Sequence, residues 1–203
     1  FAEVKTFIGT DTPLMPPAFK AADKGEQIVL TWENPGETGV NNGYVNADEL
    51  WYNIYTVEGN VATLMEGDVE DCTYTVEFAH EGEQRLAYFG VCAYTADETL
   101  GDVAVSNPVI MGAPHKLPFM ETFNMAKFDN TGWWQIGDME HIFYTYADYS
   151  SDEGSTAMMW KPELGYTETW LNSGKITLGN ATHPMLIFDW MANPGIDAGI
   201  EVY

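Results

Sequence analysis

The sequence predicts an all-β protein. Short segments in which apolar and polar residues alternate, the pattern of a strand with one buried face, recur along the chain. Turn-forming residues separate these segments, and the chain contains 19 Gly and 10 Pro, which is typical of a loop-rich β protein. Long stretches of Ala, Leu, Glu and Lys, which favour helices, are missing.

The first half of the chain contains strand-length segments with one apolar face. These are residues 27–32, 50–57, 61–65, 72–78, 86–94 and 103–111. The turn Glu58-Gly59-Asn60 closes a hairpin between the second and third segments. Short strands of this kind, packed into about 100 residues, are what an immunoglobulin-like sandwich of two sheets contains.

The apolar face of each segment identifies the residues that we expect in the core. They are Ile28, Leu30, Trp32, Leu50, Tyr52, Ile54, Cys72, Tyr74, Val76, Phe78, Phe89, Val91 and Ala93. Hydrophobic residues make up 45% of the chain and aromatic residues 14%, so there is enough apolar material for a real core.

Three of the segments resemble strand signatures of fibronectin type III domains. They are Ile28-x-Leu30-x-Trp32, Leu50-x-Tyr52-x-Ile54-Tyr55 and Tyr88-x-Gly90-Val91-x-Ala93-Tyr94. The resemblance covers residues 14–113 and implies a spacer or adhesion module with Trp32 as its core tryptophan. Residues 1–13 are then expected to be a linker or the tail of a preceding domain.

The two cysteines, Cys72 and Cys92, form no CxxC pair or Cys/His cluster, which argues against a structural zinc site. The resemblance implies that they lie in different sheets, with Cys72 facing inward and Cys92 outward. That geometry does not allow a disulfide. A chain this poor in cysteine fits a bacterial extracellular protein better than an animal one.

The composition of the sequence changes after Gly112-Ala113-Pro114. Longer segments rich in Trp and Met follow, namely Leu117-Pro118-Phe119-Met120-Glu121-Thr122-Phe123, Gly132-Trp133-Trp134, residues 171–178 and residues 184–190. In this order they resemble the first half of the MAM-like jelly roll called the cleaved-adhesin or choice-of-anchor J domain, although Gly174 stands where a proline is usual. The resemblance implies a partial jelly roll over 114–203 in a secreted or outer membrane-associated surface protein of Bacteroides-type bacteria.

We expect the chain to be a piece of a longer protein. It begins with Phe1 rather than Met and has no signal peptide. A jelly roll also needs more residues than remain after Leu117. Because half a sandwich exposes apolar faces and open edges, we expect a missing C-terminal segment or a second chain to complete it.

The charge balance restricts the possible partners. The 31 acidic residues against 8 basic ones give a net charge of −23, so nucleic acid and anionic membranes would be repelled. No apolar run is long enough to span a membrane. An acidic surface suits calcium, cationic ligands or simple solubility outside the cell.

The sequence predicts no catalytic residues. The histidines, His80, His115, His141 and His183, lie in no recognisable signature, and there is no Gly-x-Ser-x-Gly motif. Two carboxylates at a suitable separation could indicate glycoside hydrolysis, but with 31 acidic residues some pair will always lie at such a separation. A buried cleft that held His141 beside a carboxylate and a hydroxyl would reopen the question.

Calcium is the cofactor that the second block suggests. Jelly rolls of the kind that it resembles often hold a structural calcium with an early Glu and nearby Asp residues, and calcium prefers oxygen ligands. The resemblance implies Glu121 as a ligand, with Asp129, Asp148 and Asp189 as further candidates. The alternative is that these acids only solvate loops.

Aromatic residues are the candidate ligand-binding groups. Trp133, Trp134, Tyr144 and Tyr146 lie in a region crowded with Trp and Tyr, and exposed rings can stack on sugars. Tyr144 and Tyr146 would share one face of a strand, whereas Trp133 and Trp134 would point to opposite faces. The alternative is that most of these rings fill a core.

Together these features predict a non-catalytic, secreted or cell-surface module for adhesion, for binding a glycan or extracellular protein, or for spacing. The alternative is an accessory region of a secreted peptidase or glycoside hydrolase whose catalytic domain lies outside this chain.

Overall fold

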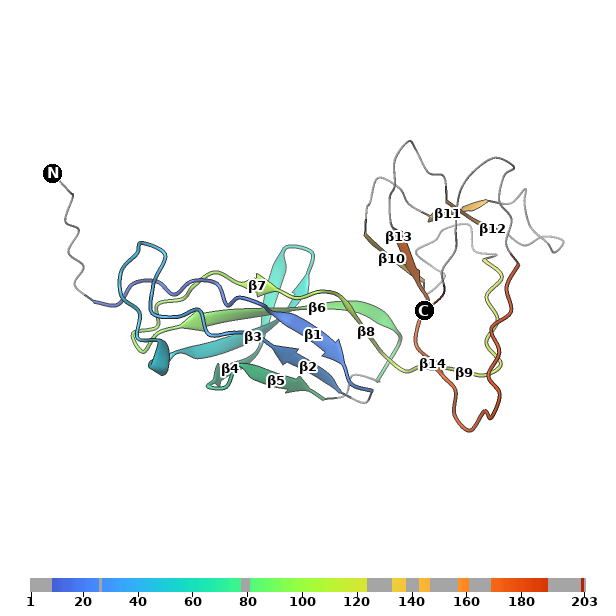
Figure 1. The fold of residues 1–203 in the computed structure, drawn as a ribbon, viewed down its shortest axis with the longest axis horizontal. Helices are drawn as coiled ribbons and strands as arrows, with labels where there is room; N and C mark the ends of the chain where they lie inside the picture. The colour runs from blue at the N-terminus through green and yellow to red at the C-terminus, as the bar shows by residue number, and fades with distance from the viewer. Residues whose placement is uncertain are drawn as a thin grey trace. The chain divides into compact units, whose positions relative to one another are not determined.

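The computed structural model describes residues 9–25, 27–77, 81–123, 133–137, 143–146, 157–160, 169–189 and 202. The chain divides into two compact units, Phe1–Pro114 and His115–Tyr203. The described elements are strands, apart from one short 3-10 turn, η1 (Ala47–Glu49) (Figure 1). The all-β prediction is therefore confirmed.

The first unit consists of two antiparallel sheets. One sheet has the order β1-β2-β5, with β1 (Lys20–Asp23), β2 (Ile28–Thr31) and β5 (Thr73–Val76). The other has the order β4-β3-β6-β7, with β4 (Val61–Val69), β3 (Trp51–Glu58), β6 (Arg85–Tyr94) and β7 (Ala104–Val105), and β8 (Val109–Met111) also pairs with β6. The strand order is that of a fibronectin type III sandwich, as predicted.

The core lies between these sheets and matches most of the predicted set. Ile28, Leu30, Ile54 and Val91 are fully buried. The Trp32 ring meets Tyr52 edge-on, with 5.2 Å between ring centroids. Each such side chain contributes roughly 1.5–3 kcal/mol through burial. Cys72 and Tyr74 are only partly buried against the core, and Phe78 lies outside the described residues.

The last predicted strand, 103–111, is wrong as a single element. It is interrupted at Ser106-Asn107-Pro108 and forms two strands, β7 and β8, which pair with different parts of β6. Pro108 has no N–H to donate to a ladder. The Asn107 side chain instead accepts from Ala21 N at 3.0 Å and donates to Ala21 O at 3.0 Å, which connects this segment to β1 in the other sheet.

The predicted position of Cys92 also needs correction. Its side chain lies on the opposite face of β6 from Val91 and Ala93, but it is only 2% exposed. Its thiol donates to Gly101 O at 3.1 Å, and burial raises the pKa of Cys92 to about 11. Both Cys72 and Cys92 are free thiols.

The N-terminal segment differs from the linker expected over residues 1–13. Asp11 N donates to Tyr44 O at 2.9 Å, and Pro13 forms a β-bridge with Gly39. Asp11 and Pro13 are both buried. Residues 11–13 therefore pack as part of the sandwich, while residues 1–8 lie outside the described residues.

The described parts of the second unit form three two-stranded ladders. β10 (Trp134–Gly137) pairs with β13 (Thr169–Asn172), β11 (Phe143–Tyr146) with β12 (Ala157–Trp160), and β9 (His115–Lys116) with β14 (Ile176–Thr177). The first two ladders are antiparallel and the third is parallel. The jelly roll stays a prediction.

Among the described residues, no helix is long and apolar enough to cross a membrane.

Candidate functional site

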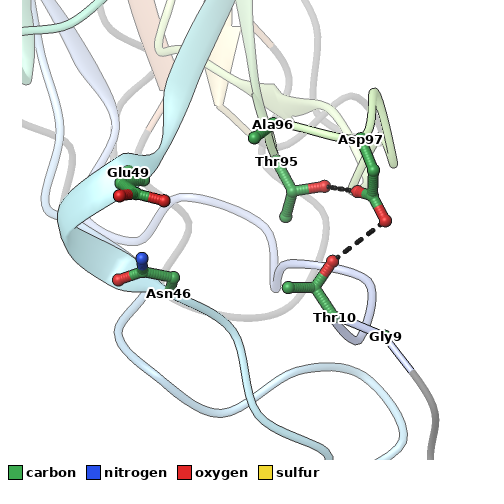
Figure 2. Close-up of a pocket in the computed structure, with 7 residues that line it drawn as sticks. All are labelled: Gly9, Thr10, Asn46, Glu49, Thr95, Ala96 and Asp97. Carbon is green, nitrogen blue, oxygen red and sulfur yellow. Dashed lines mark hydrogen bonds between the residues drawn. The ribbon is translucent and has the colours of Figure 1, made fainter.

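A shallow hollow of about 270 Å³ lies at one end of the sandwich. Three chain segments form it: the N-terminal segment, the loop and 3-10 turn that lead into β3, and the turn that follows β6. The lining residues are Gly9, Thr10, Asn46, Glu49, Thr95, Ala96 and Asp97 (Figure 2). Most of them carry a hydroxyl, an amide or a carboxylate, although the surface that they present to the hollow is mainly carbon, so the hollow suits a ligand with both polar and apolar groups.

One wall of the hollow is organised around Asp97. Thr95 donates its hydroxyl hydrogen to Asp97 Oδ1, and Thr10 donates to Asp97 Oδ2 at 3.1 Å. The hydrogen bond from Thr95, together with weaker ones, lowers the pKa of Asp97, so its carboxylate is ionised at neutral pH. Figure 2 shows Asn46 and Glu49 on the opposite side of the hollow.

A second carboxylate, Asp11, fixes the segment next to Thr10. Asp11 Oδ1 accepts from Thr12 N at 2.8 Å and from Asn41 Nδ2 at 2.9 Å. Asp11 Oδ2 accepts from Asn41 N and Gly43 N, both at 2.8 Å. These hydrogen bonds, led by the Asn41 side chain, lower the pKa of Asp11 although its side chain is only 6% exposed. A buried carboxylate with four donors holds its loop in one conformation.

The loop around Asp11 requires glycine at two positions. A Cβ on Gly39 would lie 2.6 Å from the Asp11 side chain, and one on Gly43 would lie 2.9 Å from it. The loop backbone can approach the carboxylate this closely because both residues lack a side chain.

The predicted calcium ligands are not brought together among the described residues. Glu121 is partly buried, and its Oε1 accepts from Phe123 N at 2.6 Å, while Asp189 is exposed. Asp129 and Asp148 lie outside the described residues. The described part of the chain contains no group of three or more His, Cys, Asp or Glu side chains that could hold a metal ion. Calcium binding stays a prediction.

The predicted aromatic ligand-binding residues lie at two places in the second unit. Trp133 is partly buried, and its ring lies 5.4 Å from that of Phe123, centroid to centroid. Trp134 is also partly buried and begins β10. Tyr144 and Tyr146 both belong to β11.

The histidines that the structure describes are not part of the hollow. His115 stacks on Phe119, with 4.7 Å between ring centroids and 22° between ring planes, and His183 is exposed. His80 and His141 lie outside the described residues.

Sequence reasoning missed Asp11 and Asp97. A signal was present, because each is a short acid within two residues of a Thr on both sides, in Thr10-Asp11-Thr12 and Thr95-Ala96-Asp97-Glu98-Thr99. Among 31 acidic residues, this local pattern did not distinguish them from acids that only solvate the surface.

The strand order of the first unit is that of a fibronectin type III-like sandwich. No protein-family model and no curated protein matches the chain. Domains 3 and 4 of the rat CD45 extracellular region are 21% identical over 50% of this chain and 51% of that chain, with a TM-score of 0.38. The fibronectin type III domain of human fibronectin type III domain containing protein 3 is 20% identical over 52% of this chain and 92% of that domain, with a TM-score of 0.38.

A β-1,2-glucanase from Parabacteroides distasonis is 18% identical over 52% of this chain, with a TM-score of 0.36. The match spans 13% of the glucanase chain. These likenesses concern the fold of about half of the chain.

Proposed function

We propose that this chain is a non-catalytic module of a secreted or surface-attached protein, and that it binds a glycan or an extracellular protein. The observation that supports the proposal is the hollow at the end of the sandwich, one wall of which (Thr10, Thr95 and Asp97) is held in place by hydrogen bonds before any ligand arrives. Binding groups fixed in advance lose little conformational entropy on association, which favours affinity.

The chemistry of the hollow favours a neutral or positively charged ligand. Glu49 and Asp97 supply hydrogen-bond acceptors, and the Asn46 amide can both donate and accept. Sugar hydroxyls or an amino group fit such a lining. Anionic ligands are disfavoured by these carboxylates and by the net charge of −23.

The lining residues also support a non-catalytic role. They include no His, Cys or Lys, and the Thr95 hydroxyl is directed at the carboxylate of Asp97. A serine-protease-like arrangement requires the hydroxyl to donate to a base that can later return the proton. The low pKa of Asp97 makes it a poor base for this purpose.

The second unit extends the proposal. We propose that it is the partial jelly roll that its sequence resembles, with Trp133, Trp134, Tyr144 and Tyr146 as candidate sugar-stacking residues and Glu121 as a calcium ligand. In this arrangement the fibronectin type III-like sandwich supports and spaces the second unit.

An array of glycans and an array of purified extracellular proteins, both probed with the whole chain, test the proposal. We expect at least one ligand whose binding falls about tenfold in a double variant, Asn46→Ala with Glu49→Gln, because both residues face the hollow. Glu33→Gln, which removes one exposed acid elsewhere, is the matched control. No binder on either array, or binders that are indifferent to the double variant, would contradict the proposal for this site.

A further inference from the structure

The outer face of the larger sheet is aromatic where an antiparallel sandwich is usually polar. Tyr52 and Ile54 of β3 point into the core, so their neighbours Trp51, Tyr55 and Val57 face outward. Asn53 shares this outer face, so β3 is mostly, though not wholly, apolar on both faces. A strand with this pattern is expected to be covered on both sides.

The neighbouring strands continue this face. Trp51 is opposite Tyr94, Val57 is opposite Tyr88, and Tyr55 is opposite both Gly90 on β6 and Leu64 on β4. On β7, Val105 is opposite Gly90. Leu64 is 57% exposed and Val105 53%. We call this surface the aromatic face; its members are Trp51, Tyr55, Val57, Leu64, Tyr88, Tyr94 and Val105.

The position of the Tyr94 ring is fixed at one end of this face. The rings of Trp51 and Tyr94 lie 6.0 Å apart, centroid to centroid, with 31° between their planes. The Tyr94 hydroxyl donates to Asp68 Oδ1. Asp68 lies in an irregularity of the β3–β4 pairing and has a φ of 57°, a conformation that is uncommon for a residue with a side chain.

The rim of this end is acidic. Asp68 is exposed. Besides burial, the charge of Glu98 helps to raise the pKa of Tyr94. Besides burial, the charge of Asp102 likewise helps to raise the pKa of Cys92. The basic residues in the described part of the sandwich are Lys20 and Lys24, around β1, and Arg85, at the start of β6 and thus at the other end of that strand from Tyr94.

We infer that the aromatic face is a docking surface for a basic segment of a partner protein, with a Lys or Arg side chain over the Trp51–Tyr94 pair and apolar residues over Tyr55, Leu64 and Val105. A cation is attracted both by the face of an aromatic ring and by carboxylates at its rim. The surface is distinct from the lining of the hollow, so the inference goes beyond the proposed function.

Charge decides among the possible occupants. A second copy of this chain would carry the same net charge of −23 and would be repelled, as would an anionic glycan. A basic partner is complementary, and complementary charge accelerates encounter and excludes wrong partners. A neutral glycan carries no charge, so the negative charges of Asp68, Glu98 and Asp102 would add no charge–charge attraction to its binding.

Calorimetric titration of the whole chain with a synthetic peptide of alternating Arg and Val tests the inference, with a peptide of alternating Glu and Val as the charge-reversed probe. We expect the Arg peptide to bind and the Glu peptide not to bind. Binding should weaken about tenfold in Trp51→Leu and several-fold in Asp68→Asn. It should not change in Glu33→Gln, a matched loss of one acid, or in the Asn46→Ala/Glu49→Gln variant of the hollow.

Several outcomes would overturn the inference. They are absence of Arg-peptide binding, equal weakening by Glu33→Gln, and binding of a neutral oligosaccharide that Trp51→Leu abolishes while peptide binding is unaffected. Thermal melts verify that each variant is folded. If Trp51→Leu does not fold, the NMR chemical shift of the Trp51 indole N–H in the unaltered chain tests the inference instead. An unchanged shift at saturating Arg peptide would also contradict docking here.

Discussion

Asp11 connects two segments that lie thirty residues apart in the sequence. Its two carboxylate oxygens satisfy four donors, three of which belong to the loop at Asn41 and Gly43. A buried backbone N–H without a partner is costly. This single side chain therefore determines the conformation of the loop beside the hollow.

We predict that Asp11→Asn lowers the stability of the sandwich, and that the loss depends on pH. The folded-state pKa of Asp11 lies below its ordinary value of 3.8. The carboxylate therefore contributes its full stabilisation above about pH 4 and loses it as pH falls through the folded-state pKa. Thermal melts should show a lower Tm for Asp11→Asn at pH 7, and a difference that shrinks toward pH 3. Asp48→Asn is the matched control, and a difference that is constant with pH would refute this role.

The two thiols offer a second test at this scale. Burial raises the pKa of Cys92 to about 11, so at pH 8 only about one thiol in a thousand is ionised. We predict that iodoacetamide modifies Cys92 at pH 8 only after unfolding, as measured by peptide mass spectrometry. Rapid labelling of Cys92 in the folded chain would contradict the burial of its thiol.

The strand elements show what sequence patterns can and cannot predict. Ile28, Leu30 and Trp32 were predictable because alternation alone places them on one face. β1 has the sequence Lys20-Ala21-Ala22-Asp23, which has no alternation, and it is recognised only by its pairing with β2. Pro108 is visible in the sequence as a strand breaker. The hydrogen bonds between the Asn107 side chain and the Ala21 backbone cannot be predicted from the sequence, because they connect residues 86 positions apart.

The candidate site was less predictable than the fold, for a similar reason. The hydrogen bonds of Asp11 and Asp97 depend on the backbone positions of distant loops, which no local pattern encodes. The aromatic face, by contrast, could have been found. Trp51, Tyr55 and Val57 alternate with the core residues of the same strand, and apolar residues on both faces indicate a covered surface.

Asn107 provides the prediction at the scale of elements. Asn107→Ala removes both side-chain bonds to β1 and leaves the Ala21 backbone groups without these partners. We predict a loss of about 1–3 kcal/mol in the free energy of unfolding, measured by urea denaturation. Asn60→Ala, in the exposed β3–β4 turn, is the control. Equal effects of the two changes would mean that the connection between sheets is not stabilising.

At the scale of the whole molecule, the acidic surface restricts what the chain can bind. With a net charge of −23, the compact state carries self-repulsion that cations relieve. Both units therefore have a physical reason to bind positively charged partners. The sandwich would do so through its aromatic face, and the second unit through calcium.

We predict that calcium raises the Tm of the second unit and that Glu121→Gln reduces this rise. A ligand that binds only the folded state stabilises it by RT ln(1 + L/Kd), where L is the free ligand concentration, so the stabilisation grows with the logarithm of that concentration above Kd. Differential scanning calorimetry in calcium and in chelator measures the effect, with magnesium as the control for general screening. Identical melts in calcium and chelator would remove the calcium proposal.

The central claim is that the chain binds a ligand and does not transform it. The most direct measurement is an equilibrium titration with a ligand found on the arrays, followed by mass spectrometry of the ligand after prolonged incubation with the chain. We predict saturable binding that the Asn46→Ala/Glu49→Gln variant weakens, and a ligand recovered with unchanged mass. Recovery of a cleaved or modified ligand, absent from a control without protein, would contradict the claim.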